Sequence, residues 1–592
     1  MSSFYNKRYF PEIFSVLTIL VFSIALQYYQ LKNQSLQLGI DWLFHYNRFY
    51  DSAMQIKNFD FQPYISIYGF QQSGRIINAI YGPAFAYLNG IFLIILGSWY
   101  KYQLFTNFLI TFLSALSMFL LLKRFAIRTS TSLPLSLMYS SLYIVQAWAI
   151  KEYFNSWGSF IIPIGIISGI QLLENKKKIN ILLMTFVISV AVQVHMLTAL
   201  LLVILFAIFF IIALFIREDR LDMFKRVVIS AIFTILLTAN VWYPLIDLYS
   251  KNNLLRPFVN MDMSVDAVSL QFENLLSAGQ TVSFLPMSLL LLFGLQFLLV
   301  VFNKIKSTIP RILTVISFIL LILSSKIIDW TGLAERVPLV TIIQFPWRLL
   351  TPAVCLLMLA FAITWENTLC EGLGIKKNLE KIAMPLILTI LLIGSTGVYL
   401  ALARQASDIW SSDRVVQSKN KTIFTTTGPD DLRASFDSNA NLDAPFELMM
   451  KSTPDYLPLK YASLMDEDNF YSYKEYESVA ISNPLLKVVE KKQRNGKLLI
   501  SFNSDEKEEV LLPFVVYKDT VVKYNGKEVV HKDLNLNNVG APQFGIKKGK
   551  NNFEISYKIP IMYYVALTMT ILSWVTLIIL ALKNIKIIVK GK

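Results

Sequence analysis

Three ionisable residues stand close together after the first apolar run of the chain: Asp41, His45 and Arg48. If this stretch is helical, their spacings of four and three residues place them on one face. An acid, an imidazole and a guanidinium on one face could form a polar site. A simpler interpretation is that Asp41 caps a surface helix and pairs with Arg48, which would stabilise the helix by less than about 1 kcal/mol.

The elements that must position these residues are membrane helices. The chain has 592 residues, of which 55% are hydrophobic and 14% aromatic, and its mean hydropathy is +0.51. These values predict a polytopic α-helical membrane protein. About twelve apolar runs approach the roughly 20 residues that a spanning helix needs: 12–29, 103–122, 131–149, 157–173, 179–194, 198–216, 227–244, 284–302, 309–325, 348–365, 383–402 and 560–582.

The basic residues between these runs predict the topology. Clusters such as Lys123/Arg124 and Lys376/Lys377 should face the cytoplasm, as should both chain ends, in a multi-pass protein of the cell membrane. Counting the apolar stretch 84–99 as a crossing would break this alternation, so we expect a surface or re-entrant helix there. The segment 30–102 is then the first segment on the outer side.

The segment 403–559 differs in kind from the rest. It is charged and rich in Asn, it contains alternating stretches at 497–502 and 509–516, and Asn525-Gly526 is typical of a hairpin turn. We therefore expect a transmembrane domain at 1–402, an extracytoplasmic β-rich domain at 403–559 that closes over the first outer segment, and a final helix with a basic tail at 560–592.

Several classes of function are disfavoured. The net charge of +15 comes mostly from short clusters between apolar runs, so it does not form the basic face that nucleic acid requires. Cys355 and Cys370 lie in or beside one apolar run, where they cannot build a disulfide framework or a thiolate metal site. No glycine-rich phosphate loop and no His-x-x-x-His pair is present.

Four features in their order along the chain resemble the GT-C superfamily, the polytopic glycosyltransferases that use lipid-phosphate-linked sugars. They are Asp41 after the first helix, the step Tyr81-Gly82-Pro83, Lys101 at the start of the next spanning run, and Gln344-Phe345-Pro346-Trp347-Arg348. The resemblance is closest to the bacterial YfhO-type and related membrane proteins. Those proteins are longer, and double-acid motifs of other branches are single here, which leaves the acceptor open.

The resemblance implies transfer of a monosaccharide from polyprenyl phosphate to an acceptor on the outer face, such as a teichoic acid or another envelope polymer, among membrane lipids. Such chemistry needs a base for the acceptor hydroxyl and cations for the departing phosphate. Asp41 is the expected base. Arg348, Lys101 and Arg256 are the expected phosphate ligands, although Arg348 and Lys101 could equally be interfacial side chains that reach toward the headgroups.

We expect His45, Arg48, Tyr81, Glu152 and His195 to contact substrate. Each has a simpler interpretation: Glu152 as a solvated acid paired with Lys151, His195 as a hydrogen-bonded packing residue, and Tyr81 as an interfacial aromatic. No cofactor is assigned, and a divalent metal, with Glu152 as one ligand, is left open.

A transporter or flippase of a lipid-linked saccharide is the main alternative. Transporters usually place polar groups near the bilayer midplane, in broken helices of matched halves. The apolar runs here are nearly free of charge in their middles, which favours an enzyme working at one face. A scaffold that merely anchors the β-rich domain would leave so many apolar runs unexplained.

Overall fold

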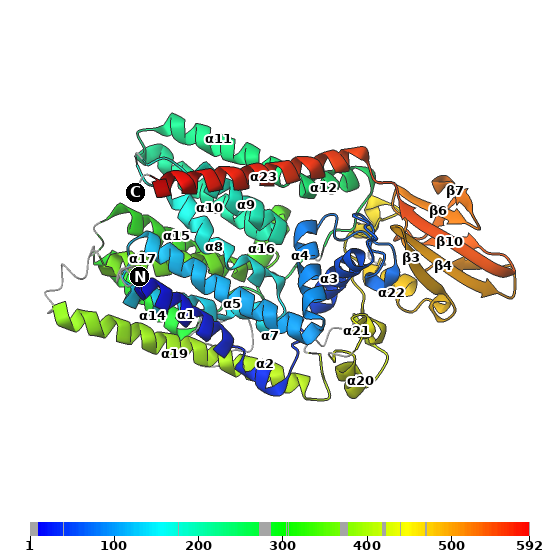
Figure 1. The fold of residues 1–592 in the computed structure, drawn as a ribbon, viewed down its shortest axis with the longest axis horizontal. Helices are drawn as coiled ribbons and strands as arrows, with labels where there is room; N and C mark the ends of the chain where they lie inside the picture. The colour runs from blue at the N-terminus through cyan, green and yellow to red at the C-terminus, as the bar shows by residue number, and fades with distance from the viewer. Residues whose placement is uncertain are drawn as a thin grey trace.

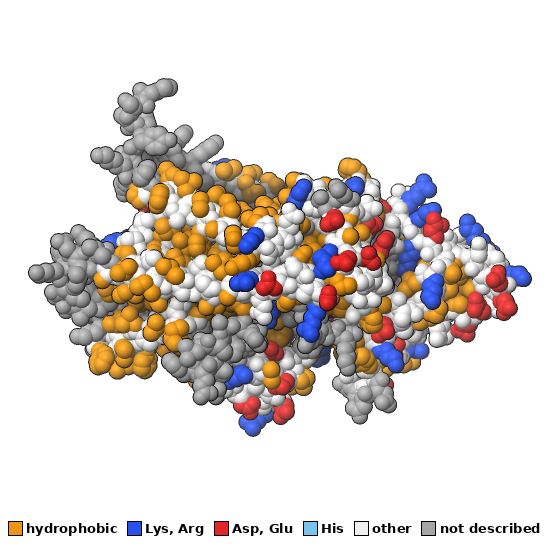
Figure 2. Space-filling model, turned by 90° about the horizontal axis from the view of Figure 1, so that it is seen from below, with side chains coloured by type: hydrophobic (Ala, Val, Ile, Leu, Met, Phe, Trp, Pro, Cys, Tyr) orange, Lys and Arg blue, Asp and Glu red, His pale blue; other side chains and the backbone are white. Residues whose placement is uncertain are grey.

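The computed structural model describes residues 10–39, 41–175, 177–257, 259–270, 286–302, 305, 307–366, 377–416, 422–437, 440–467 and 470–590. The molecule is elongated, with long helices at one end and β-strands at the other (Figure 1). Helix α1 (Phe10–Ala25) begins, and helix α23 (Ile561–Lys590) ends, at the helical end, away from the strands. On the face in Figure 2, hydrophobic side chains cover the helical end, whereas acidic and basic ones gather toward the strands.

Among the described residues, six helical stretches are long and apolar enough to cross a membrane. A seventh is obtained if α11 (Arg220–Leu237) and α12 (Ala239–Lys251), which meet at 70°, form one bent span. The expectation of about twelve spans is therefore wrong. The six stretches are Trp99–Arg124, Thr129–Lys151, Met196–Ile216, Pro346–Thr364, Ala383–Trp410 and Ile561–Asn584.

The number of predicted spans is too high because a hydropathy pattern does not show where a helix ends. The run at 157–173 begins with the 3-10 turn η2 (Phe154–Gly158), and its α-helix extends only over Ile161–Ile170. At 1.5 Å per residue, helices of 10–17 residues fall short of a hydrocarbon core about 30 Å thick. The other short apolar helices are α1 (Phe10–Ala25), α4 (Pro83–Leu96), α9 (Ile181–Val194), α14 (Met287–Val301) and α15 (Thr308–Ser324).

The helical end has a buried centre and an apolar surface. Every residue of α17 (Leu350–Thr364) is buried, as expected for a helix that is hydrophobic all round, and α17 packs against α15 and α14. In contrast, α10 (Met196–Ile216), α11 and α23 (Ile561–Lys590) expose rows of Ile, Leu, Val and Phe. An exposed apolar surface of this kind suits contact with lipid.

The first predicted outer segment forms two helices of different direction. Helix α3 (Trp42–Lys57) contains the His45 and Arg48 positions, and α4 packs against it. In Figure 1, α4 lies across the direction of α5 (Trp99–Arg124). This 14-residue helix is shorter than the candidate spans, and the expectation that 84–99 does not cross stays a prediction. The side of the membrane on which it lies stays a prediction.

The C-terminal segment contains strands and several short helices. A five-stranded antiparallel sheet has the order β3-β4-β10-β6-β7, and a three-stranded sheet has the order β5-β9-β8. The predicted alternation is seen in β4, whose side chains are alternately buried and partly exposed, and Asn525-Gly526 joins β6 to β7 with positive φ at both residues. The run 509–516 is a strand only at Glu509–Leu511.

The bounds of the remaining elements follow. The strands are β1 (Ile423–Thr425), β2 (Met449–Lys451), β3 (Glu490–Arg494), β4 (Lys497–Ser504), β5 (Glu509–Leu511), β6 (Thr520–Tyr524), β7 (Lys527–Val529), β8 (Asn535–Leu536), β9 (Pro542–Gly545) and β10 (Gly549–Tyr557). The helices are α2 (Tyr28–Asn33), α6 (Thr129–Ser141), α7 (Tyr143–Lys151), α8 (Ile161–Ile170), α16 (Trp330–Arg336), α19 (Lys377–Trp410), α20 (Pro429–Ala434), α21 (Ala444–Leu448) and α22 (Ser472–Ala480).

The five-stranded sheet shares its core with the segment between α3 and α4. Ile65, Ile67 and Ile76 belong to the same hydrophobic cluster as Ile500 and Ile555 of the sheet. Backbone hydrogen bonds also cross between the two parts, for example from the Val515 amide to the Ser73 carbonyl at 2.8 Å. The segment 403–559 is therefore packed onto the first predicted outer segment through a common core.

Candidate functional site

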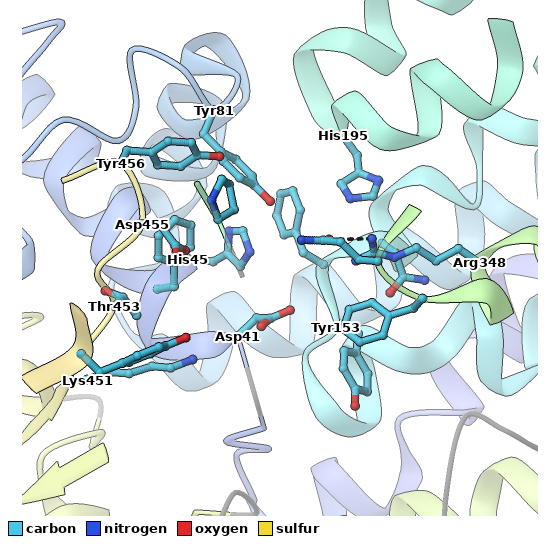
Figure 3. A pocket seen from close by; sticks show the side chains of 17 residues that line it. Asp41, His45, Tyr81, Tyr153, His195, Arg348, Lys451, Thr453, Asp455 and Tyr456 are labelled. Atoms are coloured by element: carbon cyan, nitrogen blue, oxygen red, sulfur yellow. Dashed lines mark hydrogen bonds between the residues drawn. The ribbon is translucent and has the colours of Figure 1, made fainter. Parts of the chain in front are cut away.

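A cavity of about 340 Å³ lies where the helical end meets the C-terminal segment (Figure 3). It brings together five residues singled out in the sequence: Asp41, His45, Tyr81, His195 and Arg348. The other lining residues are Phe44, Tyr153, Phe154, Asn155, Pro257, Gln344, Phe345, Lys451, Thr453, Asp455, Tyr456 and Tyr473.

Asp41 lies at the centre of this cavity, between Lys451 and Arg348 (Figure 3). It precedes the first residue of α3, but its carboxylate accepts no capping hydrogen bond from that helix, so the capping interpretation is wrong. The backbone N–H of Phe154 donates to it instead. Burial raises the pKa of Asp41 above its usual value, while Lys451, the Phe154 hydrogen bond and Arg348 act in the opposite direction.

Just before Asp41, the backbone at Gly39 packs closely against the backbone of Lys151. A Cβ at Gly39 would lie 1.9 Å from the Lys151 carbonyl oxygen, so only glycine fits. The Gly39 amide donates to Glu152 at 3.3 Å, and Gln103 Nε2 donates to the other Glu152 oxygen at 2.8 Å. Glu152 is fully buried, so the interpretation as a solvated turn acid is wrong. It does not line the cavity; it holds the segment that leads into Asp41.

Arg48 does not line the cavity but contacts two residues that do, His45 and Tyr81. Its Nε donates to Asn78 at 3.1 Å, its Nη2 donates to the Tyr81 carbonyl, and its Nη1 lies 3.0 Å from His45 Nδ1. The predicted pairing with Asp41 is thus replaced by other partners. Because a guanidinium has donors only, Nδ1 of His45 must accept, and the ring proton of neutral His45 is on Nε2.

His45 is neutral at physiological pH. Its ring stacks on Phe154 at a centroid distance of 3.8 Å. Burial, followed by the nearby charge of Arg48, holds the pKa of His45 well below its usual value. The Nε2–H group of His45 can therefore act as a hydrogen-bond donor in the cavity without adding a charge.

At the Tyr81-Gly82-Pro83 step, the backbone of Gly82 lies against the end of α9. Gly82 has φ of 68°, and a Cβ there would lie 2.2 Å from the Gln193 carbonyl oxygen. The chain can pass this close only because the residue is glycine. His195 follows α9, and its Nδ1 lies 2.8 Å from Thr198 Oγ1. Burial and Arg348 lower the pKa of His195 to about 3, so it is also neutral.

Arg348 is positioned by the residues just before it. Its Nη1 donates to the Ile343 carbonyl at 3.1 Å and to Gln344 Oε1 at 2.8 Å, and the guanidinium lies 4.7 Å from the Phe345 ring centre. These acceptors are neutral, and its Nε is buried with no protein partner. Among the described residues, no carboxylate lies within ion-pair distance of Arg348. Its positive charge is thus directed into the cavity that Asp41 also lines, without a direct ion pair to a described carboxylate.

Two predicted phosphate ligands do not reach the cavity. Lys101 is exposed in the first turn of α5, and Arg256 is exposed beside Pro257, which does line the cavity. Neither side chain is among the lining residues. Both residues are predicted at the outer boundary of the bilayer, but a position along the chain does not determine which way a side chain points.

Five lining residues come from the C-terminal segment and were not predicted: Lys451, Thr453, Asp455, Tyr456 and Tyr473. Lys451 ends β2, and Asp455 lies in the loop that follows. Burial raises the pKa of Asp455, whereas Arg75 and Lys451 lower it. No spacing in the sequence relates these residues to Asp41, since they meet only through tertiary packing.

The donor set does not fit a metal held by the protein. Among the described residues, no group of three His, Cys, Asp or Glu side chains gathers as ligands. Asp41 and Asp455 are the cavity's two carboxylates, and the positive charge of Lys451 acts on both. We therefore derive no step through a divalent metal.

Comparisons with protein-family models and with curated proteins found no match to this chain. The resemblance to the GT-C superfamily therefore remains a hypothesis based on the residues quoted above.

Proposed function

We propose that the chain is a membrane glycosyltransferase that moves a monosaccharide from a polyprenyl-phosphate donor to an acceptor hydroxyl, with Asp41 as the general base. The acceptor would be an envelope polymer, such as a teichoic acid, or another glycan. The observation that carries the proposal is the position of Asp41 between two cations, Lys451 and Arg348, in one cavity (Figure 3).

The reaction has a simple balance. The acceptor oxygen forms a bond to the anomeric carbon as the bond from that carbon to the phosphate oxygen breaks. The phosphate leaves with the electron pair, and the hydroxyl proton passes to the Asp41 carboxylate. A carboxylate with a raised pKa is a better proton acceptor than an ordinary one, while two cations nearby match the charge that develops on the phosphate.

The neutral groups of the cavity suit a sugar. His45, with its proton on Nε2, and His195 offer hydrogen bonds without competing for the phosphate charge. Tyr81, Tyr153 and Tyr456 line the same space, and aromatic faces pack against the apolar faces of sugar rings. A mixed polar and aromatic lining is therefore consistent with a saccharide held beside a phosphate.

Transport of a lipid-linked saccharide is the second candidate. It is favoured by one observation, the 70° break between α11 and α12 at Thr238, because transporters often use broken helices. However, both halves pack against α23, and neither contributes a lining residue to the cavity. The break is thus separate from the polar site, which favours the transferase.

The test uses the purified full chain in nanodiscs with a panel of polyprenyl-phosphate hexoses labelled in the sugar. Transfer is measured as label in an added envelope-polymer fraction, together with release of polyprenyl phosphate. We expect the Asp41→Asn variant to lose at least about 10²-fold in turnover while it still binds donor. Asp430→Asn is the matched control, since Asp430 is almost fully exposed.

Two outcomes would overturn the proposal. One is an Asp41→Asn variant that transfers label at the wild-type rate. The other is wild-type protein that moves the labelled lipid across the bilayer of proteoliposomes without releasing polyprenyl phosphate. The second outcome would identify the transporter.

A further inference from the structure

A second pocket begins just past the candidate site along the chain. Tyr456 lines the first cavity, and Pro458, Leu459 and Lys460 line this second one, which has a volume of about 370 Å³. Three further segments complete it: residues 251–253 at the end of α12, residues 516–518, and residues 531–540 around β8.

The lining of this pocket carries positive charge from each of its four segments. Lys251, Lys460, Lys518 and Lys532 line it, and none of its described lining residues is Asp or Glu. Lys251 is paired with Asp247 at 2.8 Å and Asp519 at 2.6 Å. In the described part of the chain, the other three lysines have no carboxylate within 4 Å. Such a one-sided cluster in a concave surface attracts anions.

The backbone of the pocket is fixed by hydrogen bonds between its segments. The Leu459 amide donates to the Asn253 carbonyl at 2.7 Å, and the Lys460 amide donates to the Asn538 carbonyl at 3.1 Å. The Val516 amide donates to the Gly540 carbonyl at 2.8 Å, and the Lys518 amide donates to Asn252 Oδ1 at 2.9 Å. The lysines are therefore brought together by a rigid frame, which lowers the entropic cost of binding.

We propose that this second pocket binds a phosphate group through Lys460, Lys518 and Lys532. A phosphate carries the negative charge and the several acceptor oxygens that ammonium groups bind. Its source is either the headgroup of a membrane lipid or a phosphodiester of a soluble polymer. The pocket adjoins the end of a candidate membrane span, because Lys251 ends α12 and α12 packs on α23, whose candidate span begins at Ile561. The inference does not depend on the proposed glycosyl transfer, because binding is measured without turnover.

The experiment compares two triple variants of the full chain in a neutral maltoside detergent. The first is Lys460→Ala/Lys518→Ala/Lys532→Ala. The control is Lys507→Ala/Lys527→Ala/Lys548→Ala, which removes the same charge from exposed positions of the same C-terminal segment. Calorimetry measures binding of inorganic tripolyphosphate, and native mass spectrometry measures retention of phosphatidylglycerol against phosphatidylcholine. Thermal unfolding confirms that both variants are folded.

We expect the first variant to bind tripolyphosphate at least about tenfold more weakly than the wild type, with the control within about twofold. That result supports the site and a soluble source. Loss of phosphatidylglycerol retention in the first variant alone, with no tripolyphosphate binding by the wild type, supports the site and a lipid source. If the wild type binds neither probe, or if both variants weaken binding equally, the proposal is wrong.

Discussion

Nη1 of Arg75 donates to Oγ1 of Thr453 at 2.9 Å and also to the Thr453 carbonyl oxygen. The same guanidinium reaches the Asp455 carbonyl through Nη2 at 2.6 Å, and it is fully buried between the rings of Phe70 and Tyr476. Arg75 thus joins the segment between α3 and α4 to the loop that brings Lys451 and Asp455 to Asp41. It is a positioning residue, since it does not itself line the cavity.

Arg75→Lys should impair function although it keeps the positive charge. Lysine keeps the charge but lacks the fork that binds Thr453 and Asp455 together, and each unpaired buried carbonyl costs roughly 1–3 kcal/mol. We expect a lower unfolding temperature and weaker donor binding. Arg404→Lys is the control, because Arg404 is mostly exposed. An Arg75→Lys protein with wild-type unfolding temperature and donor binding would contradict the positioning role of Arg75.

Arg348 and Lys101 should differ in their effect on donor binding. Arg348 lines the cavity with its charge unpaired by a described carboxylate, whereas Lys101 is exposed outside it. Arg348→Ala should weaken binding of a polyprenyl-phosphate donor by about tenfold or more, and Lys101→Ala should change it by less than about twofold. Titration of nanodisc-bound protein with a fluorescent donor analogue measures both. Equal losses of donor binding in Arg348→Ala and Lys101→Ala would indicate that Arg348 does not bind the donor phosphate.

Asp41→Asn should be at least as thermally stable as the wild type at pH 7. The folded pKa of Asp41 is raised above its unfolded value, so the folded state binds more protons and the free energy of unfolding falls as pH rises through the raised pKa. The amide variant avoids this loss. The difference in unfolding temperature between Asp41→Asn and the wild type should therefore shrink as the pH is lowered toward 4. A variant that is less stable at pH 7 and recovers nothing at low pH would indicate that Asp41 is mainly structural.

The raised pKa of Asp41 also sets the pH dependence of transfer. A general base must be deprotonated, so activity should fall as the pH drops through the folded pKa of Asp41. The histidines should not contribute a step near their usual value, since both His45 and His195 have lowered pKa values. The profile of kcat/KM for wild type and His195→Gln measures this. An inflection near pH 6.5 that disappears in His195→Gln would contradict the neutral assignment.

Gly39→Ala should disturb Asp41 without touching the cavity. The added methyl would meet the Lys151 carbonyl, which is backbone and cannot swing aside. We expect a clear drop in unfolding temperature and in donor turnover together. Gly397→Ala is the matched control, because a Cβ there meets nothing within 4 Å and α19 gains helix propensity. Wild-type unfolding temperature and turnover in Gly39→Ala would mean that the close packing of Gly39 on Lys151 does not position Asp41.

The local sequence was sufficient for the features that depend on nearest neighbours. Apolar composition predicted membrane helices, the helical interpretation of the stretch after Asp41 is confirmed by α3, and Asn525-Gly526 predicted a hairpin. It overestimated the number of spans because apolar residues continue through points where the helix breaks, such as Thr238 and the turn before Ile161. Hydropathy averages over a window, whereas a helix ends at particular backbone angles.

Only the tertiary structure decided which charged residues share the cavity. Lys451 and Asp455 lie more than 400 positions after Asp41 in the chain, and they reach it because Arg75 and the shared core of 58–81 with the sheet hold that loop in place. Lys101 and Glu152 were also predicted to contact substrate, yet Lys101 faces outward and Glu152 is bonded to Gly39 and Gln103. Side-chain direction and long-range contact arise from packing in three dimensions, and neither leaves a periodic signal along the chain.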